Sequence, residues 1–177
     1  MKVPEKRSTD TVPSVEEKIA EWEIERGLDT AQRSSVYIGV PVTTGRRFIN
    51  WFRSTGCQLQ RDNIEYERAL RAEVILPNIQ HAARFIELLR WRHVGLIIDP
   101  TSVEVPGWSQ AQYYQFWTTV INRHARRVIF LDGWEFSSGC VLEFETAQLA
   151  GIDCVSESLE PCARRPPLLA WSRERNV

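Results

Sequence analysis

The sequence contains no apolar run approaching the ~20 residues that a membrane-spanning helix needs, and its first residues lack the pattern of a signal peptide. An excess of charge of one sign is also absent, since 22 Lys and Arg residues balance 23 Asp and Glu residues, for a net charge of −1. This balance gives no electrostatic reason to expect binding to nucleic acid or to a membrane. We therefore expect a cytoplasmic protein with neither partner.

Cysteine and histidine patterns typical of metal sites are missing too. The four cysteines lie far apart, without a Cys-x-x-Cys pair: Cys57, Cys140, Cys154 and Cys162. We predict reduced thiols, no metal and no cofactor. The three histidines form no Ser–His–Asp or Cys–His set, and each is expected at the surface or at a helix end: His81, His93 and His124.

What remains is the composition of a globular domain. A chain of 177 residues, 43% of them hydrophobic, forms a sizeable core, because chains of this size bury roughly 70% of their surface on folding. We divide it into a flexible tail (1–13), an N-terminal helix and linker (14–34), an α/β domain (35–156) and a C-terminal tail (157–177). A capping-box pattern at 14–17 predicts a first helix over 15–26.

Strand and helix patterns alternate within the expected α/β domain. Apolar runs predict strands at 36–40, 94–98, 128–131 and 152–155, and a further short strand is an open alternative at 73–76. Helical periodicity predicts helices at 46–54, 77–92, 108–124 and 140–150, and the polar stretch at 65–72 is left open as a further helix. The alternation predicts a single-domain parallel sheet of four or five strands, with right-handed crossovers and helices on both faces.

The most informative unit is residues 125–151, where a strand, a polar loop and a helix follow one another. Ser137, Ser138, Gly139 and Glu143 stand where the loop opens the helix, with Glu143 expected in the first turn. Ligands of open α/β sheets bind at the carboxyl ends of strands, where helix N-termini present free N–H groups. The helix is expected to end at Gly151. Its inward face is expected to hold Leu142, Leu149 and Ala150.

A carboxylate at this position has two explanations. Glu143 can interact favourably with the helix dipole, worth roughly 0.3–1 kcal/mol, or it can be a nucleophile or base aimed into a cleft. Spacing alone favours the first explanation. Glu145 is expected in solvent, whereas Asp132 and Glu135 can face either the pocket or solvent.

A second loop, at 41–45, is rich in Thr and Gly and also opens a helix. Such a loop can hold an anion through its N–H groups, although an ordinary connection is the commoner case. On the helix that follows, the side chains expected to be buried are Phe48, Trp51 and Phe52.

Two short motifs resemble the nucleoside 2-deoxyribosyltransferase superfamily. Residues 137–143, SSGCVLE, are similar to its S-x-G-x-x-x-E motif, most closely to the 2'-deoxynucleoside 5'-phosphate N-hydrolase branch, and Ala147 also matches. Residues 36–41, VYIGVP, resemble its Y-x-x-G-P first strand. The stretch LDGWEFSSG also looks like a segment of small uncharacterised bacterial and phage proteins on this fold. The resemblance covers roughly residues 36–156 and implies a deoxyribosyltransferase-like fold.

The resemblance also implies roles for individual residues. Glu143 would be the catalytic nucleophile that attacks the sugar, and Tyr37 would hold it. Ser137 and Gly139 match positions that bind a 5'-phosphate, where a transferase's aspartate would repel it. Further candidates for substrate binding are Ser138, Gly39, Asp132, Trp134 and Asp99. The expected activity is N-glycosidic cleavage of a nucleoside 5'-phosphate or a related N-ribosyl phosphate, in a homodimer or higher homo-oligomer.

One departure from the family pattern leaves alternatives open. The family has an acid on the preceding helix that protonates the leaving base, and the matching position here lies near Trp117. Either Asp99, Asp132 or Glu104 replaces that acid, or the base leaves without it, or the protein is a non-catalytic nucleotide-binding sensor or interaction module. The aromatic candidates for stacking on the base are Tyr113, Trp117 and Trp134, although core packing is the commoner fate of such residues.

Overall fold

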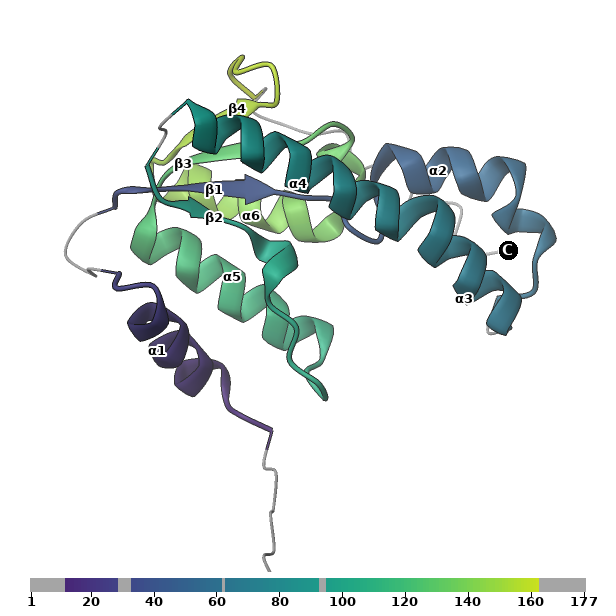
Figure 1. Ribbon diagram of the computed structural model, residues 1–177, viewed down its shortest axis with the longest axis horizontal. Coiled ribbons are helices and arrows are strands. Elements are labelled where there is room, and N and C mark those ends of the chain that lie inside the picture. The colour runs from purple at the N-terminus through teal and green to yellow at the C-terminus, as the bar shows by residue number, and fades with distance from the viewer. Residues whose placement is uncertain (1–11, 29–32, 62, 93–94, 163–177) are drawn as a thin grey trace, which may run out of the picture.

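In the computed structural model, which describes residues 12–28, 33–61, 63–92 and 95–162, four parallel strands form one sheet (Figure 1). The strand order is β2 (Ile97–Ile98), β1 (Ser35–Gly39), β3 (Ala125–Phe130) and β4 (Asp153–Ser156). Tyr37 on β1 pairs with Ile98 on one side and with Val128 on the other. The predicted parallel sheet is therefore confirmed with four strands.

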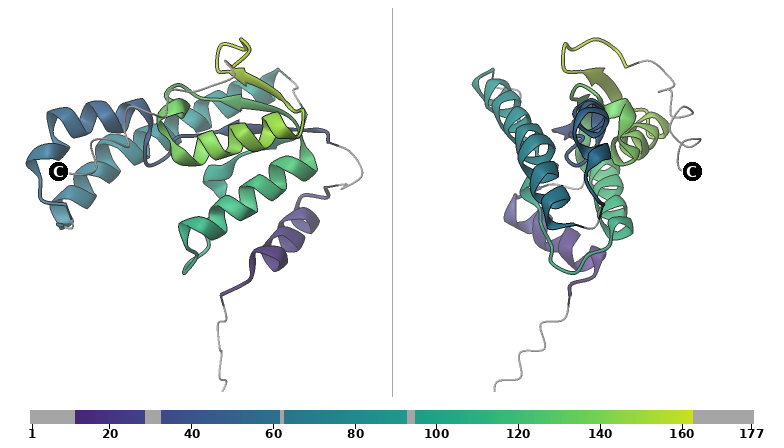
Figure 2. Two further views of the ribbon diagram at one scale, coloured as in Figure 1. Left: turned by 180° about the vertical axis from the view of Figure 1, so that it is seen from behind. Right: turned by 90° about the vertical axis from the view of Figure 1, so that its right-hand side faces the viewer.

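Helices cover both faces of this sheet, as the alternating pattern predicted (Figures 1 and 2). On one face α4 (Leu76–Trp91) buries Ala82, Ile86 and Leu89 against apolar side chains of β1 and β3. On the other face lie α5 (Gln110–His124) and α6 (Ser138–Leu149). Burial of both faces explains why the strands read as continuous apolar runs.

The first helix, α1 (Val15–Glu25), packs on the outside of α5. Its capping box is present, because Glu17 N donates to Ser14 Oγ and Ser14 N donates to the Glu17 carboxylate. Trp22 is buried edge-on against Phe116, with 6.0 Å between ring centroids. The predicted helix at 15–26 is therefore confirmed.

The open alternative of a strand at 73–76 is wrong. Residues Arg71–Ile75 form a π-helical segment that joins α3 (Ile64–Leu70) directly to α4. Val74 is fully buried, and the apolar side chains around it repeat with helical spacing, so a short apolar run was misread as a strand. The strand predicted at 94–98 is observed only at Ile97–Ile98, and residues 93–94 lie outside the described part of the chain.

Helix α2 (Gly45–Ser54) and α3, which runs on into α4, extend past the carboxyl end of the sheet (Figure 1). In α2 the buried side chains are Ile49 and Trp51, whereas Phe48 and Phe52, expected to be buried, are only partly so. The reason is that α2 lies beyond the sheet edge, where fewer layers cover it. The loop before α2 and the start of α4 thus form walls at the end of the sheet where ligands are expected.

The inward face of α6 differs from the predicted one. Leu149 is 91% exposed, and Leu142 and Ala150 are only partly buried. The buried face starts two residues earlier and continues at helical spacing through Cys140, Val141, Phe144 and Ala147. Gly151 has a φ of +67° directly after the end of the helix, as predicted for a C-terminal glycine.

The remaining sequence predictions concern the histidines and the chain ends. His124 ends α5 as expected, but it is buried and its Nε2 lies 2.8 Å from Glu23 Oε1. The N-terminal tail lies outside the described residues except at 12–13, and so does the C-terminal tail after 162. Within the described residues, no helix combines the length and apolar character needed to cross a membrane.

Candidate functional site

Glu143 lies in the second turn of α6, not in the first as predicted. The helix begins at Ser138, and its N-cap is Ser137, whose hydroxyl accepts a hydrogen bond from Cys140 N. The dipole effect falls off within the first turn, so it does not account well for a carboxylate at this position. The first of the two explanations for Glu143 is thereby weakened.

The carboxyl group of Glu143 is buried and only half satisfied. Tyr37 Oη donates a hydrogen bond to Glu143 Oε1 at 2.7 Å, joining the first strand to the last helix. Glu143 Oε2 is also buried, and it has no hydrogen bond of ordinary geometry with any described residue. An unpaired buried acceptor costs stability, so its retention at a cavity wall points to a ligand-binding role.

Burial sets the protonation state of this pair. Desolvation raises the pKa of Glu143 to about 8, although the Tyr37 hydroxyl and the Cys140 thiol act in the opposite direction. Desolvation also raises the pKa of Tyr37 well above its usual value, and the neighbouring Glu143 adds to this effect. Tyr37 therefore remains a hydrogen-bond donor to Glu143 throughout the physiological pH range.

Glu143 lines a cavity of about 550 Å³ at the carboxyl end of the sheet, a volume within the usual range for small-molecule sites. The loop after β1 and the start of α4 provide Val40, Val42, Thr43, Thr44, Ile75 and Ile79. The segment after β2 and helix α5 provide Pro100, Thr101, Val103, Glu104, Gln110, Tyr113, Tyr114 and Trp117. The start of α6 provides Ser137, Ser138, Gly139, Cys140 and Glu143.

The structure therefore brings together five of the sequence-predicted site residues. Ser137, Ser138, Gly139 and Glu143 line one cavity, and Tyr37 is tied to it through the Glu143 carboxylate. Ser138 is exposed at the helix start, where the first N–H groups of α6 have no partner within the helix. The combination is a carboxylate beside a helix N-terminus that can receive an anion.

Four other predicted site residues lie outside this cavity lining. Gly39 is a packing glycine, because an added Cβ would overlap the Phe130 ring. Asp132 is exposed and pairs with Arg46 at 3.3 Å. Trp134 packs on Phe130, at 4.6 Å between ring centroids. Asp99 accepts hydrogen bonds from the Thr101 N–H and hydroxyl at the next turn, Pro100–Ser102. None of the four is placed to line the hollow beside Glu143.

Trp117 stands where the resemblance leads one to expect an acid. Its side chain is buried, lines the cavity, and packs edge-on against Tyr37 with 5.8 Å between ring centroids. Of the three acids considered as replacements, only Glu104 lines the cavity. Glu104 is an exposed residue of this lining.

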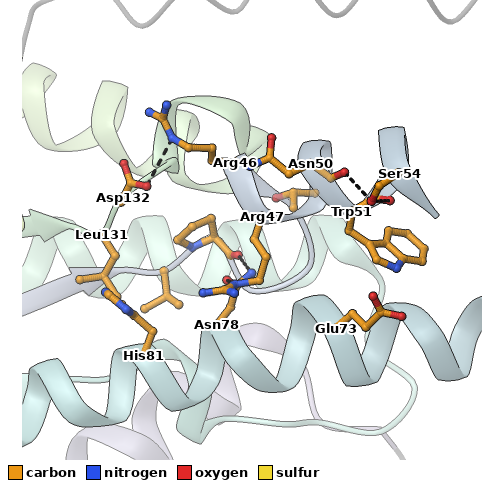
Figure 3. A pocket seen from close by; sticks show the side chains of 13 residues that line it. Arg46, Arg47, Asn50, Trp51, Ser54, Glu73, Asn78, His81, Leu131 and Asp132 are labelled. Carbon is orange, nitrogen blue, oxygen red and sulfur yellow. Dashed lines mark hydrogen bonds and ion pairs between the residues drawn. The ribbon is translucent and has the colours of Figure 1, made fainter. Parts of the chain in front are cut away.

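A second hollow of about 430 Å³ adjoins the loop after β1 (Figure 3). Val40 and Thr44 line both hollows, so this loop is a shared wall. Asn78 holds the loop by donating hydrogen bonds to the backbone oxygens of Pro41, at 2.8 Å, and Val42, at 3.0 Å. Its side-chain oxygen accepts from Arg47 Nε at 2.9 Å.

Asn78 was missed by the sequence interpretation. An asparagine on the apolar side of the helix predicted at 77–92 was the available signal, because a buried amide needs partners that the helix itself does not supply. Figure 3 shows Asn78 and Arg47 pointing toward each other from α4 and α2. The Thr- and Gly-rich loop predicted as a possible anion site is thus fixed from the side of α4.

Within the described residues, no group of three or more His, Cys, Asp or Glu side chains is arranged to hold a metal ion. Comparison of the chain with protein-family models, with curated proteins and with solved structures gives no significant match. The fold shown is therefore an α/β fold with a four-stranded parallel sheet flanked by helices. A closer assignment depends on the site itself.

Proposed function

We propose that the protein cleaves the N-glycosidic bond of a nucleoside 5'-phosphate or a related N-ribosyl phosphate on a deoxyribosyltransferase-like fold. The observation that carries the proposal is the Tyr37–Glu143 hydrogen bond of 2.7 Å at the wall of a cavity of about 550 Å³. Because Tyr37 occupies Oε1, the second carboxylate oxygen is left for a substrate carbon.

The proposed reaction has two steps. Glu143 Oε2 attacks the anomeric carbon, the bond from that carbon to the base nitrogen breaks, and the electron pair leaves with the base. Glu104 supplies the proton that the departing base needs. Water then attacks the anomeric carbon of the glycosyl ester, the Glu143 carboxylate leaves, and Glu104 takes up the proton of the water. The products are the free base and the sugar phosphate.

The lining of the cavity offers suitable contacts for both ends of such a substrate, the phosphate and the base. Ser137, Ser138 and the N–H of Gly139 suit a phosphate, because hydroxyl donors and helix N-terminal N–H groups favour negative charge. Tyr113 and Trp117 offer aromatic surface on α5 for the base. This division assigns the phosphate to α6 and the base to α5.

The test measures base release from a panel of 5'-nucleotides by chromatography. We expect wild-type protein and Glu145→Gln to release base, since Glu145 is an exposed residue of the same helix, and Glu143→Gln to release none. Ser138→Asp should weaken use of the nucleotide but not of the matching nucleoside. Base release by Glu143→Gln at the wild-type rate would refute the assigned nucleophile.

A non-catalytic nucleotide-binding sensor or interaction module is the second candidate. It is favoured by one observation, the buried indole of Trp117 where a catalytic acid is expected. Calorimetry separates the two functions: binding of a 5'-nucleotide to the wild type without any release of base would select the sensor.

We also propose a homodimer or larger homo-oligomer, because relatives of the resembled family complete their sites with a neighbouring subunit. The N-terminal helix α1 is the proposed contact between subunits. Ile24 on this helix is 81% exposed and can take part, whereas Trp22 is 2% exposed and packs within its own chain. Light scattering after size exclusion tests the proposal, and a species of 20.5 kDa alone would contradict it.

A further inference from the structure

The chain turns back along the edge strand β4 directly after it ends. Ser156 N donates to Glu160 O at 2.8 Å, and Cys162 N donates to Cys154 O at 3.0 Å. Between these two bonds, Val155 pairs with Pro161 in an antiparallel bridge. β4 is the last strand of the sheet, so the returning segment covers an edge that would otherwise be open to pairing.

This register places two cysteines opposite each other. Cys154 lies one position before Val155 and Cys162 one position after Pro161, so the two form a cross-strand pair. Directly opposite residues of a hydrogen-bonded antiparallel pair have Cα atoms about 5.5 Å apart and side chains on the same face. Disulfides have Cα separations of roughly 4.4–6.8 Å, so the backbone spacing is suitable.

The side chains of both cysteines contact the same apolar cluster. Cys154 belongs to the apolar cluster on the α6 side of the sheet, and Cys162 packs against that cluster. Both are free thiols, Cys154 buried and Cys162 partly exposed. A pair of thiols on one face, one of them reachable from solvent, is the arrangement that thiol–disulfide exchange requires.

We propose that Cys154 and Cys162 are a modification site, a thiol pair that a small-molecule disulfide oxidises to an intrachain disulfide. The bond fastens the returning segment to β4, which it now pairs with through the two backbone hydrogen bonds that flank the Val155–Pro161 bridge. This inference does not depend on the proposed function, because neither cysteine lines the cavity beside Glu143.

The chemistry balances as two exchanges. The Cys162 thiolate attacks one sulfur of the oxidant, forming a mixed disulfide and releasing one small thiolate. The Cys154 thiolate then attacks the Cys162 Sγ, which forms the internal bond and releases the second small thiolate. The protein loses two protons and two electrons, and the oxidant is reduced to two thiols.

Burial makes this exchange slow at neutral pH. Desolvation raises the pKa of Cys154 to about 12, and the nearby Cys162 and Asp153 add to this effect. Desolvation also raises the pKa of Cys162 to about 11, with added effects of Glu135 and Asp153. Because only the thiolate form attacks a disulfide, the oxidation should be carried out at alkaline pH.

The test treats the whole folded protein with oxidised glutathione at alkaline pH, blocks remaining thiols by alkylation, and maps peptides by mass spectrometry. We expect a peptide pair joined through Cys154 and Cys162 in the wild type and in the matched control Cys57→Ser, whose cysteine is exposed elsewhere. Cys162→Ser should form no such pair. A stable glutathione adduct on Cys162 with Cys154 still alkylated would overturn the proposal.

A second measurement uses the wild type alone and does not depend on any variant folding. Hydrogen exchange of the amides of Ser156 and Cys162 should slow by about tenfold or more after oxidation, because the disulfide removes local opening of the paired segment. Unchanged exchange in protein that carries the internal disulfide would show that the bond does not fasten this segment.

Discussion

Replacing Glu143 by glutamine should change how stability depends on pH, whatever the protein's activity. The folded protein holds a proton on this carboxyl group up to a pKa of about 8, because burial disfavours the charge, whereas an ordinary glutamate titrates near 4.5. Between these values the folded state binds one proton more than the unfolded state. Stability contributed by protonated Glu143 is therefore complete below pH 4.5 and is lost as pH rises to about 8.

The size of the effect follows from this interval. At about 1.4 kcal/mol per pH unit, the loss of stability from pH 4.5 to 8 amounts to about 5 kcal/mol as an upper value. Glutamine keeps the acceptor for Tyr37 but places an amide N–H₂ where Oε2 lies without a partner. In acid the protonated Oε2 of the wild type is also a donor without a partner, so the two proteins should differ little in stability there. The variant should be more stable than the wild type near pH 8, because it has no buried charge to form.

The assay is urea unfolding of both proteins at several pH values between 5.5 and 7.5. The unfolding free energy of the wild type minus that of Glu143→Gln should fall by about 1.4 kcal/mol per pH unit. Glu145→Gln, at an exposed position of the same helix, should leave the wild-type slope unchanged. Parallel pH profiles for the wild type and Glu143→Gln would refute the buried, protonated state on which this reasoning depends.

Three further substitutions test the residues that position Glu143 and the loop after β1. Tyr37→Phe should lower the unfolding free energy measured in urea by about 1–3 kcal/mol, because a buried hydrogen bond is lost. It should also raise the pKa of Glu143, measured by carboxyl spectroscopy, because the Tyr37 hydrogen bond stabilises the charged form in the wild type. Gly39→Ala should cost about 1–3 kcal/mol, since its Cβ would meet the Phe130 ring, and full stability would contradict this packing. Asn78→Ala should cost about 1–3 kcal/mol and weaken nucleotide binding in calorimetry, whereas unchanged binding would show that the loop needs no support.

The strands and most helices could be predicted because each carries its own local signal. The apolar runs at β1 and β3, the capping box before α1 and the glycine after α6 all act within a few residues of sequence. Local signals failed where tertiary position decides burial. Leu149 keeps helical spacing with Leu142, but packing buries a different face of α6, the one that carries Cys140, Val141, Phe144 and Ala147.

The candidate site was also predicted only in part, because local signals identify residues that are contiguous in the sequence. Residues 137–143 are contiguous, so one motif located the cavity wall at the start of α6. Asp132 and Trp134 come shortly before this motif, yet the chain turns at Gly133, with a φ of +79°, and these two side chains lie at other surfaces. The link from Tyr37 to Glu143 spans most of the domain, and no periodicity or spacing indicates such a contact.

The protonation state of Glu143 also separates the two candidate functions. Trp117 lines the same cavity and packs on Tyr37, and burial at this cavity wall raises the pKa of Glu143. A nucleophile must be ionised, so the kcat/KM of an N-glycosidase should rise about tenfold per pH unit from pH 6 and level off near 8. A sensor that receives a phosphate beside this carboxyl group should instead bind best below pH 8, because the ionised carboxylate repels the phosphate. Base release that is fastest at pH 6 would contradict a Glu143 nucleophile, and nucleotide affinity that increases through pH 8 would contradict the sensor.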